Sequence, residues 1–410
     1  MRKLFTFLMT FFILIKMSKK FWNIMYLIFP KFTFLFSEKT LVFILFCIII
    51  IMISSSLGNI DEKWLVLSLM FIICLIVTSL INLRFNYSFI NNFSILFDSY
   101  LLFFFLLVLL GLKTDFFDMK ICLKTILLFS FFQGILGILQ YITKNTIIPI
   151  YDIDGNPIVS SIYYLNGVSS NKSFFVQQYG AKIRSFGMTD SALTLGLLML
   201  FALAVIISHK DIFGKRLRTI LVSVYIVTIV FTLTRVIYMA CILLLAILIF
   251  RNNSKFLKSF FYVFLCVQSL VLILSNYIDA ISKYLTSSYT GSLVSRLEGY
   301  HYFIGYYGFS IGNFLMGMDN VSYGNFLHSF YTLDNESLNI YMDIGFIGCL
   351  FVFFTMLSVL KLKRGNNIPV DLVIMALFPF VGIINSVYYF FSGVAIFMVI
   401  FYKNEREKKL

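Results

Sequence analysis

The sequence predicts an all-α polytopic membrane protein with about twelve transmembrane helices and two long extracytoplasmic loops. Hydrophobic residues make up 60% of the 410 residues, charged residues only 13%, and the mean hydropathy is +0.93. A soluble globular domain carries roughly 25% charged residues, so this composition indicates a chain that lies in a bilayer. The apolar stretches do not alternate with polar residues in ~10-residue segments, which favours helices over a β-barrel. We expect residues 1–410 to form a single integral membrane domain.

Apolar runs of near-spanning length define the expected helices. Two short candidates, Leu4–Ile15 and Phe21–Phe36, lie near the start, and Pro30-Lys31 interrupts the second. We expect one of them to cross the membrane and the other to lie in the interface. The remaining expected spans are Leu41–Ser56, Trp64–Ile81, Phe93–Leu112, Ile121–Ile142, Met188–Ser208, Thr219–Leu233, Val236–Phe250, Phe256–Ser275, Leu338–Leu360, Ile368–Ile384 and Val387–Tyr402.

The distribution of basic residues predicts the orientation of these helices. If both termini are cytoplasmic, 23 of the 33 Lys and Arg residues fall on the inner side and 10 fall outside. This asymmetry follows the positive-inside rule. The rule also accounts for the net charge of +14, which in a soluble protein would favour nucleic acid, so we expect no nucleic-acid partner. Residues 143–187 and 276–335 then become two large outer loops.

The stretch Asn276–Asp343 differs in composition from everything around it. It is rich in Tyr, Ser, Gly and Asn, and it holds two of the three histidines. A polar segment of this size between two spans must lie outside the hydrocarbon, where its backbone groups can be satisfied. It has too many aromatic residues for a disordered segment, so we interpret it as the reaction or recognition loop. The first loop contains a turn sequence, Asp154-Gly155-Asn156-Pro157, and we expect a small hairpin there.

Three arginines, Arg184, Arg235 and Arg296, are expected at the outer membrane boundary, each beside small or turn residues. Arginine near hydrocarbon is costly and usually has an anionic partner. Its planar guanidinium suits phosphate oxygens, to which it donates two parallel hydrogen bonds. The alternative is that these side chains snorkel to the interface or pair with Asp190 or Glu298. Three arginines on one outer face favour an anion site.

An acidic cluster ends the second loop and leads into the span Leu338–Leu360. On one interpretation, Asp334 caps that helix and Glu336 favours its dipole. However, Glu336, Asn339 and Asp343 recur at i, i+3 and i+7, which puts a polar stripe on one helix face. Acids inside a membrane are functional by default, and a carboxylate here could act as general base toward a sugar hydroxyl.

The histidines offer weaker candidates for the same role. His328 lies six residues before Asp334 and is an alternative candidate for the base, and His301 is a weaker one. His209 falls in the KDIFGKR region, where we expect an ordinary loop residue. All six cysteines lie in apolar runs, which predicts core packing and neither a disulfide nor a metal site.

No motif for a metal or a nucleotide is convincing. The sequence lacks HExxH, a P-loop and a Rossmann glycine pattern. Asp152-Ile153-Asp154 has the spacing of an acidic metal-binding pair but falls in the predicted turn. We therefore expect no metal and no cofactor.

An ordered series of motifs runs from Phe131 to the C-terminus. FFQGILGILQY ends a span before the first long loop, and RSFGMTDSALTLGLL opens the next span. TLTRVIYMA occupies a tight outer gap, SRLEGY and IGNFLMGMDN lie in the second loop, and LDNESLNIYMDIGFIGCLF enters a later span. In this order the motifs resemble the Wzy-type O-antigen and capsular polysaccharide polymerases and the related O-antigen ligases. The residues before Phe131 match only as apolar spans.

The resemblance implies a metal-independent glycosyltransferase with a GT-C-like membrane fold in the bacterial plasma membrane. Its donor would be a growing glycan on undecaprenyl pyrophosphate, and its acceptor a lipid-linked repeat unit. Arg184 and Arg235 match the boundary arginines thought to hold the pyrophosphate, and Arg296 matches the loop arginine. Asn335 and Asn339 complete the candidate substrate-binding set. The resemblance also implies a chain-length regulator and a flippase as partners.

Other functions stay open. Ligases of this group typically carry a His-Asn pair where this chain has Asp334-Asn335, which favours a polymerase and leaves the base undecided. A flippase or another transporter of lipid-linked glycans would be expected to have charges in a central cavity and short outer loops. A membrane acyltransferase would need a buried histidine, and no expected span has one in its middle.

Overall fold

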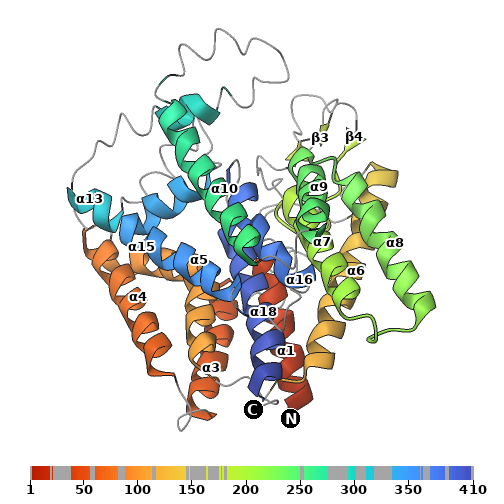
Figure 1. The fold of residues 1–410 in the computed structure, drawn as a ribbon, viewed down its shortest axis with the longest axis horizontal. Helices are drawn as coiled ribbons and strands as arrows, with labels where there is room; N and C mark the ends of the chain where they lie inside the picture. Colours follow the sequence, from red (N-terminus) through yellow and green to blue (C-terminus); the bar gives the residue numbers. More distant parts are fainter. Residues whose placement is uncertain are drawn as a thin grey trace, which may run out of the picture.

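In the computed structural model the chain forms a bundle of helices, with both termini at the same end (Figure 1). The residues that the structure describes are 2–18, 21, 38–55, 61–81, 88–112, 117–144, 147, 163–164, 175–176, 178–179, 182–249, 254–275, 277, 294, 296–301, 311–317, 335–360, 362, 370–383 and 387–407.

The helices follow the predicted apolar runs in order. Their bounds are α1 Arg2–Met17, α3 Glu38–Ser55, α4 Glu62–Ile81, α5 Phe89–Gly111, α6 Met119–Thr143, α7 Ala192–Ser208, α8 Lys215–Phe231, α9 Arg235–Ile249, α10 Ser254–Ser275, α13 Ile311–Met316, α15 Glu336–Leu360, α16 Val370–Val373, η3 Ile374–Leu377, α17 Phe378–Val381 and α18 Tyr388–Glu407.

Within these described residues, five helices are long and apolar enough to cross a membrane, namely α4, α5, α6, α10 and α15. Shorter apolar helices are Thr40–Ser54, Ala192–Ser208, Arg235–Ile249, Val370–Val381 and Tyr388–Lys403. The chain is therefore a helical membrane protein, as the composition predicted. The larger number of spans stays a prediction, and the candidate span Phe21–Phe36 lies outside the described residues apart from Phe21.

Basic side chains tie helix ends together at the end of the bundle that holds the termini (Figure 1). Arg2 donates from Nη2 to the carbonyl of Phe117 at 2.7 Å. Lys403, near the end of α18, donates from Nζ to the carbonyls of Leu110 and Leu112 at 2.5 and 2.6 Å. The last carbonyls of a helix have no partner within it, and a cation beside them is favourable. Lys403 therefore fixes the end of α5 against α18.

The helix α18 is buried along its length from Tyr388 to Tyr402. It packs against α5, α1 and α15. Its apolar residues lie on all sides, as expected for a helix surrounded by others. Its first turn carries Tyr388 and Tyr389, and both are anchored by polar contacts described below.

A second packing unit consists of α6, α7 and α8. The helices approach closely at Gly134, where an added Cβ would lie 3.0 Å from Thr228 Oγ1, and at Gly137, where it would lie 2.9 Å from Leu195 Cδ2. The Tyr225 hydroxyl donates to the carbonyl of Leu127 at 2.6 Å across the same interface. These contacts cover one face of α6.

The helix α15 is broken at Gly345, which has φ 68° and ψ −170°, a region that only glycine adopts readily. The end of α13 lies in this break, and a Cβ on Gly345 would meet the carbonyl oxygen of Leu315 at 2.3 Å. Thr78 of α4 donates from Oγ1 to the carbonyl of Met316 at 2.8 Å. The predicted span Leu338–Leu360 is thus helical but not continuous.

The predicted span Ile368–Ile384 is not one regular helix either. Over residues 370–381 it consists of α16, the 3₁₀ turn η3 and α17 in succession. Pro379 lies at the start of α17, where its missing N–H cannot continue the preceding helical ladder. The apolar run predicted a helix because composition alone does not register this change of pitch.

The first long loop contributes two short antiparallel pairs among its described residues. Strand β1 (Tyr163–Tyr164) pairs with β2 (Phe175–Val176), and β3 (Gln178–Tyr179) pairs with β4 (Lys182–Ile183). A small hairpin therefore does occur in this loop, but between Gln178 and Ile183. The predicted turn at Asp154-Gly155-Asn156-Pro157 lies outside the described residues.

Candidate functional site

The segment that carries Arg184 is held by two buried glutamines of α6. Gln140 accepts hydrogen bonds at Oε1 from the N–H groups of Phe186 and Gly187, at 3.2 and 2.8 Å, and donates from Nε2 to the carbonyl of Gly187 at 2.9 Å. Gln133 accepts from the N–H of Met188 at 2.8 Å. An irregular backbone at membrane depth needs such partners for its polar groups. The glutamines therefore fix the chain directly after Arg184.

The same segment brings Arg184 beside the junction that carries Arg235. The N–H of Ser185 donates to the carbonyl of Phe231, the last residue of α8, at 3.0 Å. Arg235 begins α9 four residues later and is exposed. Tyr238, one turn into α9, lies within electrostatic range of Arg184. The two arginines thus flank one helix junction, although 51 positions separate them in the sequence.

A polar chain leads from this segment to the first turn of α18. The Tyr389 hydroxyl donates to Asp190 Oδ2 at 3.1 Å and lies 3.0 Å from Thr194 Oγ1. Ser191 caps α7, because its Oγ accepts from the N–H of Thr194 at 3.1 Å. Asp190 is therefore held by Tyr389.

Glu336 is fully buried and reaches the same turn of α18 from the other side. Its Oε2 accepts hydrogen bonds from the N–H of Val387 and from the N–H of Tyr388, the second at 3.0 Å. Its own N–H donates to the carbonyl of Gly382 at 2.8 Å. A carboxylate at the start of a helix satisfies unpaired N–H groups and complements the helix dipole. Glu336 is the first residue of α15, as the sequence predicted, and its carboxylate also reaches the start of α18.

Asn335 caps α15. Its Oδ1 accepts from the N–H of Leu338 at 3.0 Å, and its Nδ2 donates to the carbonyl of Ile383 at 3.2 Å. The sequence predicted Asp334, one residue earlier, as the cap of this helix. With Asn335 in the capping position, the need for Asp334 as a cap disappears. Asp334 itself lies outside the described residues, and so does His328.

The predicted polar stripe on α15 is present. Asp343, at i+7 from Glu336, is buried and accepts a hydrogen bond at Oδ2 from the Tyr100 hydroxyl at 3.0 Å. The Tyr100 ring stacks on the Tyr388 ring at a centroid distance of 4.7 Å. Asn339, at i+3, is half-buried. The two acids of the stripe therefore both face the start of α18.

Gln268 is a site residue that the sequence did not single out. It is fully buried on α10, where its Nε2 donates to the carbonyl of Pro379 at 2.6 Å and its Oε1 accepts from the Ser337 hydroxyl. Gly382 leaves room for it, since an added Cβ would lie 2.5 Å from Gln268 Nε2. The available signal was a single amide in an otherwise apolar run, and its partner could not be read from sequence.

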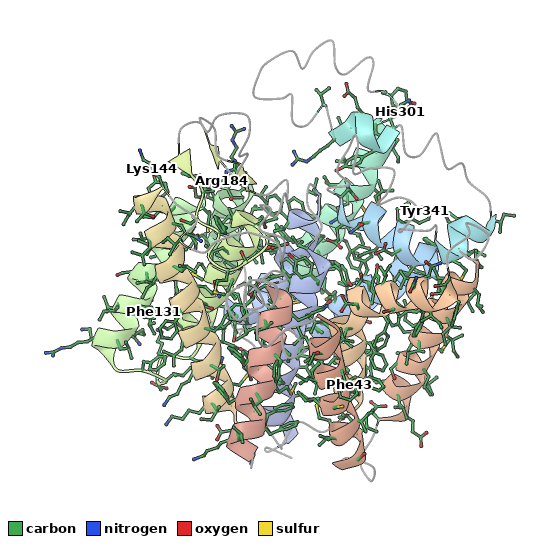
Figure 2. The ribbon with its side chains drawn as sticks, turned by 180° about the vertical axis from the view of Figure 1, so that it is seen from behind. Phe43, Phe131, Lys144, Arg184, His301 and Tyr341 are labelled. Carbon is green, nitrogen blue, oxygen red and sulfur yellow. The ribbon has the colours of Figure 1, made fainter. Side chains whose placement is uncertain are left out.

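The remaining candidates are not joined to this cluster by the recorded contacts. Arg296 is half-buried and His301 is exposed. Figure 2 shows His301 at the same end of the molecule as Arg184 but on the other side of it. The structure therefore brings Arg184, Arg235, Asn335 and Glu336 to neighbouring elements.

His209 is more than a loop residue. It lies at the end of α7, and its Nε2 is 3.0 Å from Oδ2 of the buried Asp371. Ser208 and Tyr402 donate to the other carboxylate oxygen at 3.1 and 2.5 Å. This cluster joins α7, α16 and α18 at the opposite end from Arg184.

The part of the chain that the structure describes contains no set of metal ligands. No group of three His, Cys, Asp or Glu residues is arranged to hold a metal ion among those residues. All six cysteines are described and none forms a disulfide. The expectation of a metal-independent reaction stays a prediction.

Comparisons with family models, curated proteins and solved structures found no match to this chain. The site therefore has to be interpreted from its own geometry.

Proposed function

We propose that this protein is a membrane glycosyltransferase that polymerises undecaprenyl-pyrophosphate-linked oligosaccharide repeat units into a surface polysaccharide, capsule or O-antigen. It acts on the outer face of the bacterial plasma membrane, with both termini in the cytoplasm. Its fold is of the GT-C-like kind, with the donor and the acceptor both lipid-linked. The order of motifs and the arrangement of the polar cluster support this proposal.

The observation that supports the proposal is that the segments carrying Arg184 and Arg235 lie at one helix junction. The bond from Ser185 to Phe231 joins the two arginine-bearing segments. Two guanidinium groups at one boundary suit the pyrophosphate of a lipid-linked sugar, because each can donate two parallel hydrogen bonds to phosphate oxygens. The contacts of Asp190 and Glu336 with the first turn of α18 link the Arg184 segment to the start of α15.

The proposed reaction uses the residues on both sides of that turn. The acceptor hydroxyl attacks the anomeric carbon of the donor sugar, and the bond from that carbon to the pyrophosphate oxygen breaks. The hydroxyl proton passes to a general base, for which Asp334 is the first candidate and His328 the second. Undecaprenyl pyrophosphate leaves with the bonding electron pair, stabilised by Arg184 and Arg235. Asn335 and Glu336 hold the two helix ends beside the base.

Lysine substitution tests the arginine site. Arg184→Lys and Arg235→Lys keep the charge but lose the planar fork, so each should lose about 1.5–3 kcal/mol of transition-state stabilisation. The expected readout is a polysaccharide ladder that is nearly absent while protein levels stay normal. Arg216→Lys is the matched control, because Arg216 is exposed in the first turn of α8, at the other end of that helix. Normal ladders from both site variants would remove the pyrophosphate assignment.

A transporter is the second candidate, and one observation favours it. Asp343 and Asp371 are buried between helices of the bundle, as acids are in many transport proteins. Both, however, accept hydrogen bonds from neighbouring side chains, which is equally typical of structural acids. A ligase is the third, and it differs from a polymerase only in its acceptor. Purified protein that moves lipid-linked glycan across a vesicle membrane without lengthening it would favour the transporter.

A further inference from the structure

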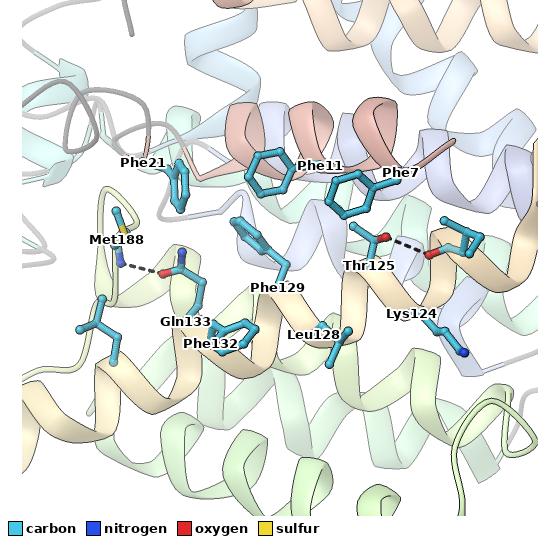
Figure 3. A pocket seen from close by; sticks show the side chains of 12 residues that line it. Phe7, Phe11, Phe21, Lys124, Thr125, Leu128, Phe129, Phe132, Gln133 and Met188 are labelled. Carbon is cyan, nitrogen blue, oxygen red and sulfur yellow. Dashed lines mark hydrogen bonds between the residues drawn. The ribbon is translucent and has the colours of Figure 1, made fainter. Parts of the chain in front are cut away.

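A large apolar groove lies between α1 and α6 (Figure 3). It has a volume of about 630 Å³. Phe7 and Phe11 of α1 face Phe129 and Thr125 of α6 across it. The other residues that line it are Phe21, Ile121, Lys124, Leu128, Phe132, Gln133, Leu136 and Met188.

The groove follows one face of α6, and α1 packs along its side. Ile121, Leu128, Phe132 and Leu136 recur at the spacing of one helix face. Phe132 is 67% exposed and Leu128 is 41% exposed, although α6 is an apolar helix of membrane-spanning length. In a bilayer, apolar side chains exposed on such a helix contact hydrocarbon. The groove is therefore open sideways to the membrane interior.

One end of the groove reaches the segment that carries Arg184. Met188 and Gln133 form that end and are joined by the hydrogen bond from the Met188 N–H to Gln133 (Figure 3). Arg184 precedes Met188 by four residues, on backbone that Gln140 fixes in place. Below that end the lining side chains are apolar apart from Thr125, whose hydroxyl donates to the carbonyl of Ile121, and Lys124. A cationic residue, Arg184, therefore lies near one end of an apolar groove. This arrangement is complementary to a lipid with an anionic headgroup.

The length of the groove distinguishes between kinds of lipid chain. From Ile121 to Leu136 it follows α6 for about 22 Å, at 1.5 Å per residue. One leaflet of hydrocarbon is roughly 15 Å deep, half of the ~30 Å core. The groove is therefore longer than one leaflet is deep, which suits a lipid chain that extends past the bilayer midplane.

We propose that the α1–α6 groove binds the long isoprenoid chain of the lipid-linked substrate, with its pyrophosphate at Arg184. This rests on the proposed function for the identity of the headgroup. The groove orients the substrate, because a chain held along α6 delivers the pyrophosphate to the α8–α9 junction rather than elsewhere on the outer surface. Binding energy from this remote part of the substrate then positions the reacting end.

Photocrosslinking tests the groove without requiring turnover. A benzophenone amino acid replaces Leu128 in the full chain, reconstituted in phosphatidylethanolamine–phosphatidylglycerol vesicles that contain undecaprenyl pyrophosphate. The matched control is Leu350, which is 40% exposed and lines a smaller apolar groove of about 350 Å³ between α4 and α15. That groove has no charged side chain among its described lining residues. We expect mass spectrometry to find the undecaprenyl adduct at position 128 and not at 350.

Three other results would overturn the groove assignment. These are equal labelling at 128 and 350, labelling at 128 by phospholipid alone, and labelling at 128 by another segment of this chain. Labelling by undecaprenyl lipid in a protein that never lengthens a glycan would keep the groove and remove the polymerase. The two proposals can therefore fail separately.

Substrate chain length supplies a second measurement. Leu128→Trp narrows the groove, so the ratio of activity on undecaprenyl carriers to activity on carriers of two or three isoprene units should fall. A fall of roughly tenfold corresponds to lost burial of about two CH₂ groups. Leu350→Trp should leave the ratio as in the wild type. An unchanged ratio in Leu128→Trp, with the protein folded and active, would contradict the proposal.

Discussion

Among single residues, two polar groups of the candidate site, Asn335 and Glu336, make hydrogen bonds that hold helix ends. Asn335 Oδ1 and Glu336 Oε2 each accept hydrogen bonds from helix N–H groups, so both residues have a structural role. Asp334 precedes them in the sequence and lies outside the described residues. It stays the first candidate for the general base of the proposed reaction.

The base assignment predicts a specific pattern of losses. Asp334→Asn should abolish polymer, because an amide cannot take the acceptor proton. His328→Ala should retain part of the activity. The measurement is polymer ladder length in cells that lack the native gene. A normal ladder from Asp334→Asn together with loss in His328→Ala would move the role to the histidine.

Glu336→Gln should act mainly through stability. The carboxylate accepts two N–H groups at the start of α18 and complements its dipole, and replacing it with a neutral amide should cost about 1–2 kcal/mol. We expect a lower unfolding temperature of the purified protein and a partial loss of polymer. Unchanged thermal stability with complete loss of polymer would instead give Glu336 a direct part in the reaction.

At the scale of elements, the break in α15 explains how the second outer loop attaches to the bundle. The end of α13 fits into the break, and Thr78 of α4 holds it there. Irregular backbone of this kind is tolerated at membrane depth only where protein covers it. The break lies two residues after Asp343, so it also ends the polar stripe.

A glycine substitution tests this joint. Gly345→Ala places a side chain at φ 68°, which costs about 1–3 kcal/mol for the backbone conformation. It also drives a Cβ against the carbonyl of Leu315. Gly312→Ala on α13 is the control, since an added Cβ there has nothing within 4 Å. We expect a lower unfolding temperature and less polymer from Gly345→Ala alone, and equal behaviour of the two variants would show that the joint is dispensable.

At the scale of the whole molecule, sequence reasoning located the helices because each apolar run is long enough to need burial. It did not find the break at Gly345, since the φ angle of that glycine depends on α13 packing against it. It also missed the partners of Gln133, Gln140 and Gln268. A lone amide in an apolar run indicates a buried hydrogen bond, but its partner lies far away in the sequence and cannot be read from spacing.

The arginine pair was likewise predicted only in part. Its position beside turn residues was visible in the sequence, and so was the suitability of arginine for phosphate. The contact between the Arg184 segment and the α8–α9 junction was not, because it depends on how α6 presents Gln140 and Gly137 to that segment. The sequence therefore predicted the residue types of the site, whereas packing determined which of them meet.

The predicted orientation of the bundle has its own test. Reporter tags after His209, Arg251 and Leu410 should be cytoplasmic, whereas tags within 143–182 and 287–323 should be outside. The reason is the excess of basic residues in the expected inner loops. A cytoplasmic tag within 287–323 would contradict the enzyme, since the proposed reaction takes place on the outer face.

Reconstitution with the proposed substrate tests directly whether this protein polymerises lipid-linked repeat units. Cells that lack this protein should accumulate the unpolymerised lipid-linked repeat unit, and a lipid extract of those cells supplies it. The purified protein in vesicles, without metal or nucleotide added, should convert the extract into a ladder of longer lipid-linked glycans and release one undecaprenyl pyrophosphate for each bond formed. An unchanged repeat unit in the presence of well-folded protein, or its transfer across the vesicle membrane without lengthening, would contradict the account.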